Sequence, residues 1–139
     1  MKRVLSTLSA VFISAAALLA DNWKSPLRFD TYNWDFGQIN PLEGTVCHTF
    51  TFTNTSKSAA RINSDIPSCG CISAFYDDNA VEPGESATVM VAYSPSKDKS
   101  KSYRRIELLD RDGNTLASLS VEADVIEADE NAEISYPYL

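Results

Sequence analysis

The sequence has a single histidine, and this scarcity argues against most nucleophilic and acid–base enzymes. His48 lies in an alternating apolar and polar stretch, with no serine–glycine elbow nearby to complete a Ser–His pair. No pair of carboxylates stands out among the charged positions, and no glycine-rich phosphate loop is present. Asp35-Phe36-Gly37 matches a kinase tripeptide without the other motifs that must accompany it. We therefore predict a protein that is not an enzyme and needs no cofactor.

Basic residues are also few. Lysine and arginine number 12 against 19 aspartates and glutamates, which gives a formal net charge of −7. Nucleic acids and anionic lipid surfaces are bound by clustered cations. The charge balance therefore predicts that nucleic acid is not a partner.

The N-terminus has the three parts of a secretory signal peptide. Lys2 and Arg3 form a basic start, residues 4–19 carry no charge, and several alanines supply the small residues that cleavage requires. The uncharged run is shorter than the roughly 20 apolar residues of a transmembrane helix, and serine and threonine interrupt it. We predict a signal peptide over residues 1–20, cut after Ala17 or Ala20. The protein is then periplasmic or secreted, with no membrane span after cleavage.

Helical periodicity is missing from the rest of the chain, where apolar residues recur at every second position instead. This period is typical of half-buried strands, and Phe50 and Phe52 are predicted to face the core together. Turn-forming residues separate the strands at intervals of roughly ten residues, as in a β-sandwich. The predicted strands cover residues 27–34, 46–53, 59–62, 87–93, 103–109 and 115–125.

The sequence thus predicts an all-β protein: an immunoglobulin-like antiparallel β-sandwich of about seven strands over residues 21–126. Residues 35–39 are predicted as the exit from the first strand, and the polar residues 94–102 as a mobile loop. Residues 110–114 have some calcium-loop character, but Val121 stands where the bidentate glutamate belongs, so a hairpin turn is predicted. Residues 127–139 form an acidic, then aromatic, C-terminal tail.

Cysteine is scarce as well, and its number, three, is odd, so at most one internal bridge can form. Cys69-Gly70-Cys71 is the strongest chemical feature of the chain. Cα atoms two residues apart on a strand lie about 6.6 Å apart, at the edge of the range that a disulfide accepts, and a turn at Gly70 brings them closer. A bridge within this ring contributes only about 1.6 kcal/mol of chain entropy, against about 3.4 kcal/mol for a Cys47–Cys69 loop. Three readings stay open: a tight turn, a redox pair and a metal clip.

A metal clip would use Cys69, Cys71 and His48, with Cys47 as a further candidate, a ligand set suited to copper(I) or zinc. However, His48 shares a strand face with Phe50, while Cys47 points the other way. One strand does not easily direct both side chains to a single ion. We therefore predict His48 as a partly buried strand residue.

A series of short motifs lies at residues 29–30, 34–39, 48–55, 67–72, 81–86 and 89–93. Their order and spacing resemble an exported bacterial family known as domain of unknown function 1573. The resemblance covers about residues 27–126 and implies an immunoglobulin-like sandwich akin to hydin and major-sperm-protein domains. Such domains are mostly binding or scaffolding modules, and the family has no established activity.

These observations predict an exported, non-catalytic binding or scaffolding module of the bacterial envelope. Its partner would be another envelope protein or a surface polymer, bound by edge-strand pairing or by a loop surface. Trp23, Tyr136 and Tyr138 are the predicted contact residues. The alternative function is thiol-redox chemistry or copper or zinc handling by Cys69 and Cys71.

Overall fold

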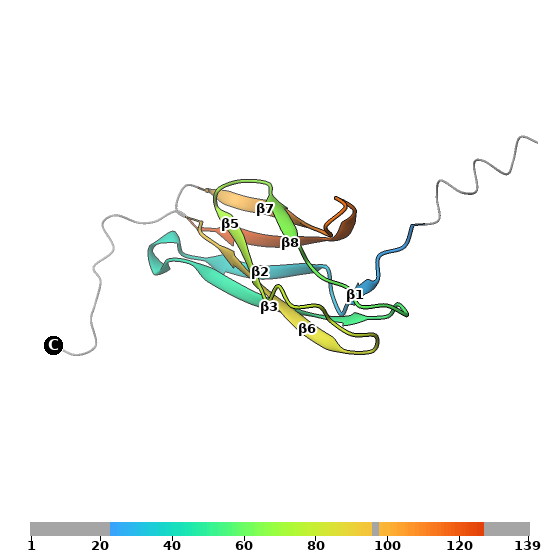
Figure 1. The fold of residues 1–139 in the computed structure, drawn as a ribbon. Coiled ribbons are helices and arrows are strands. Elements are labelled where there is room, and N and C mark those ends of the chain that lie inside the picture. The colour runs from blue at the N-terminus through green and yellow to red at the C-terminus, as the bar shows by residue number, and fades with distance from the viewer. Residues whose placement is uncertain (1–22, 96–97, 127–139) are drawn as a thin grey trace, which may run out of the picture.

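The computed structural model describes residues 23–95 and 98–126, which form two stacked four-stranded sheets (Figure 1). The predicted signal peptide and C-terminal tail, with Tyr136 and Tyr138, lie outside the described residues. The strands are β1 (Leu27–Phe29), β2 (Asn33–Ile39), β3 (Val46–Asn54), β4 (Ser64–Pro67), β5 (Ile72–Tyr76), β6 (Ser86–Tyr93), β7 (Ser100–Leu109) and β8 (Thr115–Val125), with a short 3-10 helix at Pro41–Glu43.

One sheet has the strand order β1-β3-β6-β5, and the other has the order β2-β8-β7-β4. The predicted all-β immunoglobulin-like sandwich is confirmed, with eight strands instead of about seven. All pairings are antiparallel except that of β2 with β8, which is parallel. No helix in the described part of the chain is long and apolar enough to cross a membrane.

The core lies between the sheets and is built from the alternating side chains that the sequence predicts. Phe50 and Phe52 of β3 are 1% and 2% exposed, and they belong to the same core cluster as Ile106 and Leu108 of β7, which are fully buried. Burying such a side chain contributes about 1.5–3 kcal/mol. Asn54, at the end of β3, continues the same phase into the core.

The first strand is where the sequence-based prediction is wrong. Residues 27–34 do not form one strand, because the chain leaves β1 at Phe29 and begins β2 in the other sheet at Asn33. Asp35-Phe36-Gly37 is not an exit turn either. The register of β2 against β8 shifts between Asp35 and Gln38, and Gly37 takes φ +71° while its N–H donates to Asp35 Oδ1 (2.8 Å). The residues that resemble a turn in the sequence therefore form a β-bulge within β2.

The observed secondary structure differs from the prediction in three further places. Ser100–Ser102 belong to β7 and pair with β8, so this part of the predicted loop is strand. Residues 59–62 make one bridge, Ala60 to Val81, instead of a strand. The short strands β4 and β5 carry little alternation in sequence and were not predicted.

Candidate functional site

The Cys69-Gly70-Cys71 segment forms the turn that carries the chain from β4 in one sheet to β5 in the other. Cys69 and Cys71 are joined by a disulfide, with their Cα atoms 5.2 Å apart. Both side chains are half-buried at the margin of the core. The Cys71 N–H also donates to Cys69 Sγ, at 3.2 Å. The tight-turn and bridge readings of the sequence thus describe the same structure.

Backbone hydrogen bonds hold both ends of this turn independently of the bridge. Before it, the Ser68 N–H donates to Arg105 O (2.8 Å), and the Arg105 N–H donates to Ser68 Oγ (3.0 Å). After it, the Ser94 N–H donates to Cys71 O (2.8 Å). The turn is therefore fixed to β7 on one side and to the end of β6 on the other.

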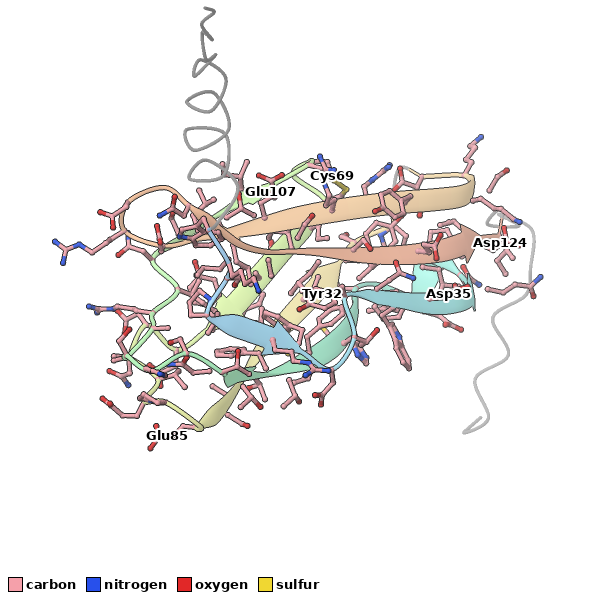
Figure 2. The ribbon with its side chains drawn as sticks, turned by 90° about the vertical axis from the view of Figure 1, so that its right-hand side faces the viewer. Tyr32, Asp35, Cys69, Glu85, Glu107 and Asp124 are labelled. Carbon is pink, nitrogen blue, oxygen red and sulfur yellow. A yellow bond between two sulfur atoms is a disulfide. The ribbon has the colours of Figure 1, made fainter. Side chains whose placement is uncertain are left out.

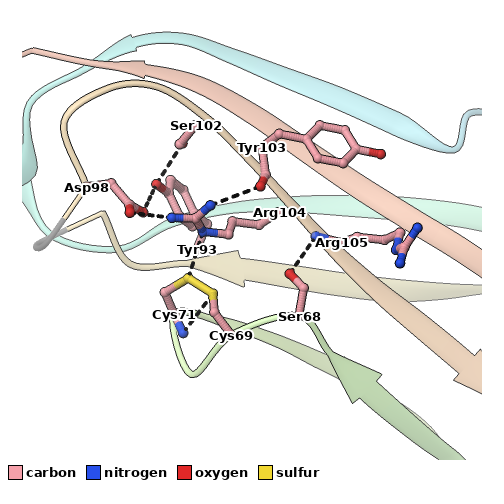
Figure 3. The surroundings of a disulfide bond; sticks show 9 residues. All are labelled: Ser68, Cys69, Cys71, Tyr93, Asp98, Ser102, Tyr103, Arg104 and Arg105. Carbon is pink, nitrogen blue, oxygen red and sulfur yellow. Dashed lines mark hydrogen bonds and ion pairs between the residues drawn. A yellow bond between two sulfur atoms is a disulfide. The ribbon is translucent and has the colours of Figure 1, made fainter.

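Arg104 of β7 lies against the bridge (Figure 3). Its Nε–H donates to Cys71 Sγ at 3.2 Å, its Nη1 donates to Tyr103 O at 3.0 Å, and its Nη2 forms an ion pair with Asp98. Sequence analysis missed this residue although a signal was present. Arg104 is in phase with the buried Ile106 and Leu108, and a charged residue on a core-facing strand position is rarely found without a partner.

Tyr93 of β6 contacts the Asp98 side chain that pairs with Arg104. The residue is fully buried, and its hydroxyl contacts Asp98 Oδ2 (2.5 Å) and Ser102 Oγ (2.8 Å). Burial, together with the Asp98 carboxylate, raises the pKa of the Tyr93 phenol, so this group stays protonated and donates to Asp98. Asp98 is thereby shared between a phenol and a guanidinium, and it holds Arg104 in place.

His48 does not join the cysteine pair. Its ring stacks on Trp34 of β2, with centroids 3.8 Å apart and planes 8° apart, and packs edge-on against Phe50. Asp35 is the neighbour of Trp34, and Figure 2 shows β8 and β7 lying between Asp35 and Cys69. In the other sheet, β6 lies between β3, which carries His48, and β5. The predicted ligands of a metal clip are thus separated. Within residues 23–95 and 98–126, no three His, Cys, Asp or Glu side chains are grouped to hold a metal ion.

The remaining predicted residues are placed as follows. His48 is half-buried on its strand, as expected, and Cys47 is exposed on the opposite face with a free thiol. Trp23 is 48% exposed and precedes β1.

His48 gives a prediction for the pH dependence of stability. Burial lowers the pKa of this imidazole below its ordinary value of 6.5. The unfolded chain then takes up a proton near pH 6.5, whereas the folded domain does so only at lower pH. The free energy of unfolding is therefore highest above pH 6.5 and falls as the pH drops below that value. Urea unfolding between pH 7.5 and 5.5 should show this fall in the wild type and a smaller one in His48→Gln; equal falls would contradict the assignment.

Strand β5 is a second feature that sequence analysis missed. It is one of the two edge strands of its sheet, and it contains no charge and no proline. The neighbouring strands β6 and β3 also lack Asp, Glu, Lys and Arg. Across these three strands, Thr49, Met90 and Phe75 stand in register as one outward-facing row. The row borders a shallow groove of about 780 Å³.

An open groove at the far end of the sandwich, about 890 Å³ in volume, carries the cations Lys24, Arg61 and Arg111. Arg61 Nε already donates to Asp78 O. Asp110 also lines the groove and adds a carboxylate to it. The mixture of charges gives this groove no clear preference for an anionic polymer.

The two sheets and their strand order define a PapD-like, immunoglobulin-like β-sandwich with a disulfide-closed turn at one margin. Residues 27–125 match the family model described as "Protein of unknown function (DUF1573)", and the chain belongs to this family. The resemblance seen in the sequence is thereby confirmed. No curated protein matches the chain.

Three solved structures with the same fold are distant from this chain in sequence. VesB protease of Vibrio cholerae is 22% identical, with a TM-score of 0.57 over 72% of this chain and 32% of its own. A protein of unknown function from Porphyromonas gingivalis W83 is 17% identical, with a TM-score of 0.60 over 71% and 46%. PapD-like domain 7 of human CEP192 is 12% identical, with a TM-score of 0.56 over 93% and 100%. The chain spans less than half of the first two structures, and these similarities describe the fold alone.

Proposed function

We propose that this chain is an exported, non-catalytic binding module of the bacterial envelope, and that it binds an extended strand of a partner protein along the free edge of β5, which pairs with no other strand among the residues that the structure describes. The observation that carries the proposal is the contrast between β5 and the other three sheet edges. Soluble proteins usually protect an edge with a charge, a proline, a bulge or a very short strand, because an unprotected edge recruits other strands.

Each of the other edges has such a device. β1 is three residues long and contains Arg28. β2 has the bulge at Gly37 and the charge of Asp35. β4 contains Asp65 and Pro67. β5 has none of these, so it is the edge best suited to accept a strand.

The backbone of β5 is also suitably oriented. Because the Ser94 N–H donates to Cys71 O, the alternation of an antiparallel ladder turns the N–H and C=O groups of Ile72, Ala74 and Tyr76 away from β6. The spacing of these outward N–H and C=O groups matches that of the backbone groups on another extended polypeptide. A polysaccharide has no such regular row of amide donors and acceptors. This favours a protein partner over a surface polymer.

The side chains beside this edge indicate what the partner strand carries. Phe75 is 55% exposed, and Met90, its cross-strand neighbour, is 37% exposed. β5, β6 and β3 carry no Asp, Glu, Lys or Arg, and the two carboxylates of the adjoining groove, Asp77 and Glu85, lie just beyond the ends of β5 and β6. We expect the partner strand to place an uncharged, partly apolar side chain against Phe75.

A charge placed on this edge tests the proposal. Phe75→Lys adds the kind of residue that natural edges use for protection, so we expect at least a tenfold loss of partner captured from an envelope extract by the mature domain. Ile66→Lys is the matched control, because Ile66 is 54% exposed and lies on the edge strand β4. Quantitative mass spectrometry of the captured proteins gives the readout.

The pair of variants separates the possible outcomes. Loss with Phe75→Lys and retention with Ile66→Lys supports the β5 edge. Equal retention by both variants contradicts it. Capture that persists after protease treatment of the extract, but disappears after glycosidase treatment, identifies a surface polymer and overturns the assignment to a protein strand.

A further inference from the structure

We infer that the Cys69–Cys71 bridge is an exchangeable disulfide that oxidises a dithiol protein, with Cys69 as the attacked sulfur and Cys71 as the leaving group. This inference does not rest on the proposed binding function, and it concerns the turn before β5 instead of the edge of β5. Three observations carry it: the fold does not depend on the bridge, a cation stands at one of its two sulfurs, and both cysteines are open to solvent in part.

The first observation concerns what holds the turn. The hydrogen bonds of Ser68 to β7 and of Ser94 to Cys71 O fix the backbone before and after the bridge. The bridge itself closes a ring of only three residues, so it restricts the unfolded chain little. Reduction therefore leaves both flanking strands paired. A bridge that contributes little to folding is free to open and close in the folded domain.

The second observation distinguishes the two sulfurs. Cys71 Sγ accepts a hydrogen bond from the charged guanidinium of Arg104, whereas Cys69 Sγ accepts one from a neutral backbone N–H. Both contacts are 3.2 Å, but a charge-assisted hydrogen bond to a thiolate is the stronger of the two. A cation beside a cysteine favours its thiolate form, and a stabilised thiolate is the better leaving group. The geometry therefore directs attack to Cys69.

Asp98 also binds the Arg104 guanidinium, so the cation is shared between this carboxylate and Cys71. The Asp98 carboxylate also accepts a hydrogen bond from the buried Tyr93 hydroxyl, and the ion pair uses Nη2 of Arg104. Nη1 is occupied by Tyr103 O, which leaves Nε–H directed at Cys71. Asp98 thus positions Arg104 without occupying the donor that faces the sulfur. Arg104 acts here as a positioning and charge-stabilising residue beside the reacting atoms.

The proposed exchange has two steps. A thiolate of the partner attacks Cys69 Sγ, a new S–S bond forms between them, and the Cys69–Cys71 bond breaks with its electron pair on Cys71 Sγ beside Arg104. The partner's second thiolate then attacks the partner sulfur of this mixed disulfide and releases Cys69 as a thiolate. The partner leaves oxidised to a disulfide, and the chain is left with two reduced cysteines. Protons from the partner's thiols pass to water, and the released sulfurs take theirs from it.

The test uses a Cys47→Ser background, which removes the exposed third thiol. The folded domain is equilibrated with glutathione buffers and, separately, with a dithiol such as dithiothreitol, then quenched in acid and alkylated. We expect full reduction without denaturant and an unchanged β-sheet circular dichroism spectrum. We also expect the transient mixed disulfide to carry glutathione on Cys69, as read by peptide mass mapping.

Arg104 variants test the role of the cation. Arg104→Met should shift the exchange equilibrium toward the disulfide by about tenfold or more, and Arg104→Lys should restore part of the shift. Arg105→Met is the matched control, since Arg105 is the next residue of β7, is exposed and contacts neither sulfur through its side chain. A bridge that is reduced only in denaturant, glutathione found on Cys71, or equal equilibria for Arg104→Met and Arg105→Met would each overturn the inference.

Discussion

Replacing Phe50 by alanine is expected to lower the free energy of unfolding by about 3–5 kcal/mol, a large part of the 5–15 kcal/mol typical of a domain. Phe50 is 1% exposed and lies between the sheets, where the His48 ring packs edge-on against it. Removing the ring leaves a cavity that two hydrogen-bonded sheets cannot easily close. Urea unfolding followed by circular dichroism measures the change.

Phe75→Ala is the matched control for this prediction. Phe75 is also a phenylalanine on a strand of the same sheet, but it is 55% exposed and faces outward. Its truncation should change the free energy of unfolding by no more than about 0.5 kcal/mol. If the two variants lose similar amounts of stability, the alternation that places Phe50 inside and Phe75 outside is wrong.

The second large effect is expected at Asn54, which is fully buried at the end of β3. Its amide nitrogen donates to Ser58 O (2.9 Å) and Val81 O (2.8 Å), and its amide oxygen accepts from the Ser56 N–H (2.9 Å) and Ser56 Oγ (2.7 Å). One side chain thereby joins the turn after β3 to the segment that precedes β6.

Asn54→Leu keeps the size of this side chain but removes all four hydrogen bonds. It leaves the Ser56 N–H without its acceptor, whereas Val81 O keeps the Ala60 N–H and Ser58 O keeps the Ser56 hydroxyl. Each lost hydrogen bond contributes about 0.5–1.5 kcal/mol, so we expect a loss of about 2–4 kcal/mol in the free energy of unfolding. Thermal unfolding of Asn54→Leu beside the exposed Asn79→Ala gives the comparison. If Asn54→Leu is as stable as Asn79→Ala, the Asn54 amide does not join the two segments as described.

Local pattern explains which parts of the fold the sequence predicts. The strand cores around Phe50, Val91, Ile106 and Val121 alternate over many residues, because one face is buried and the other is not. β2 was misread because Asp35-Phe36-Gly37 has the residues of a turn, while the parallel partner that makes it a strand is β8, far along the chain. Such pairing leaves no local signal.

The sequence likewise predicts one part of the candidate site and not the other. The cysteine pair and its tight turn follow from spacing alone, and the half-buried position of His48 follows from its phase with Phe50. The approach of Arg104 to Cys71 depends on how β7 of one sheet meets the turn into β5 of the other, a contact across 33 residues. The lack of charge on β5 is visible in sequence, but its place at an edge is not.

The most direct test of the central claim, that this domain binds through the free edge of β5, is site-specific photo-crosslinking in the living cell. A photoreactive residue replaces Phe75 in one strain and Ile66 in another, and the crosslinked products are compared on the same gel. The account predicts a discrete, protease-sensitive product from position 75 and none from position 66. A product from position 66 alone, or the same product from both positions, would contradict it.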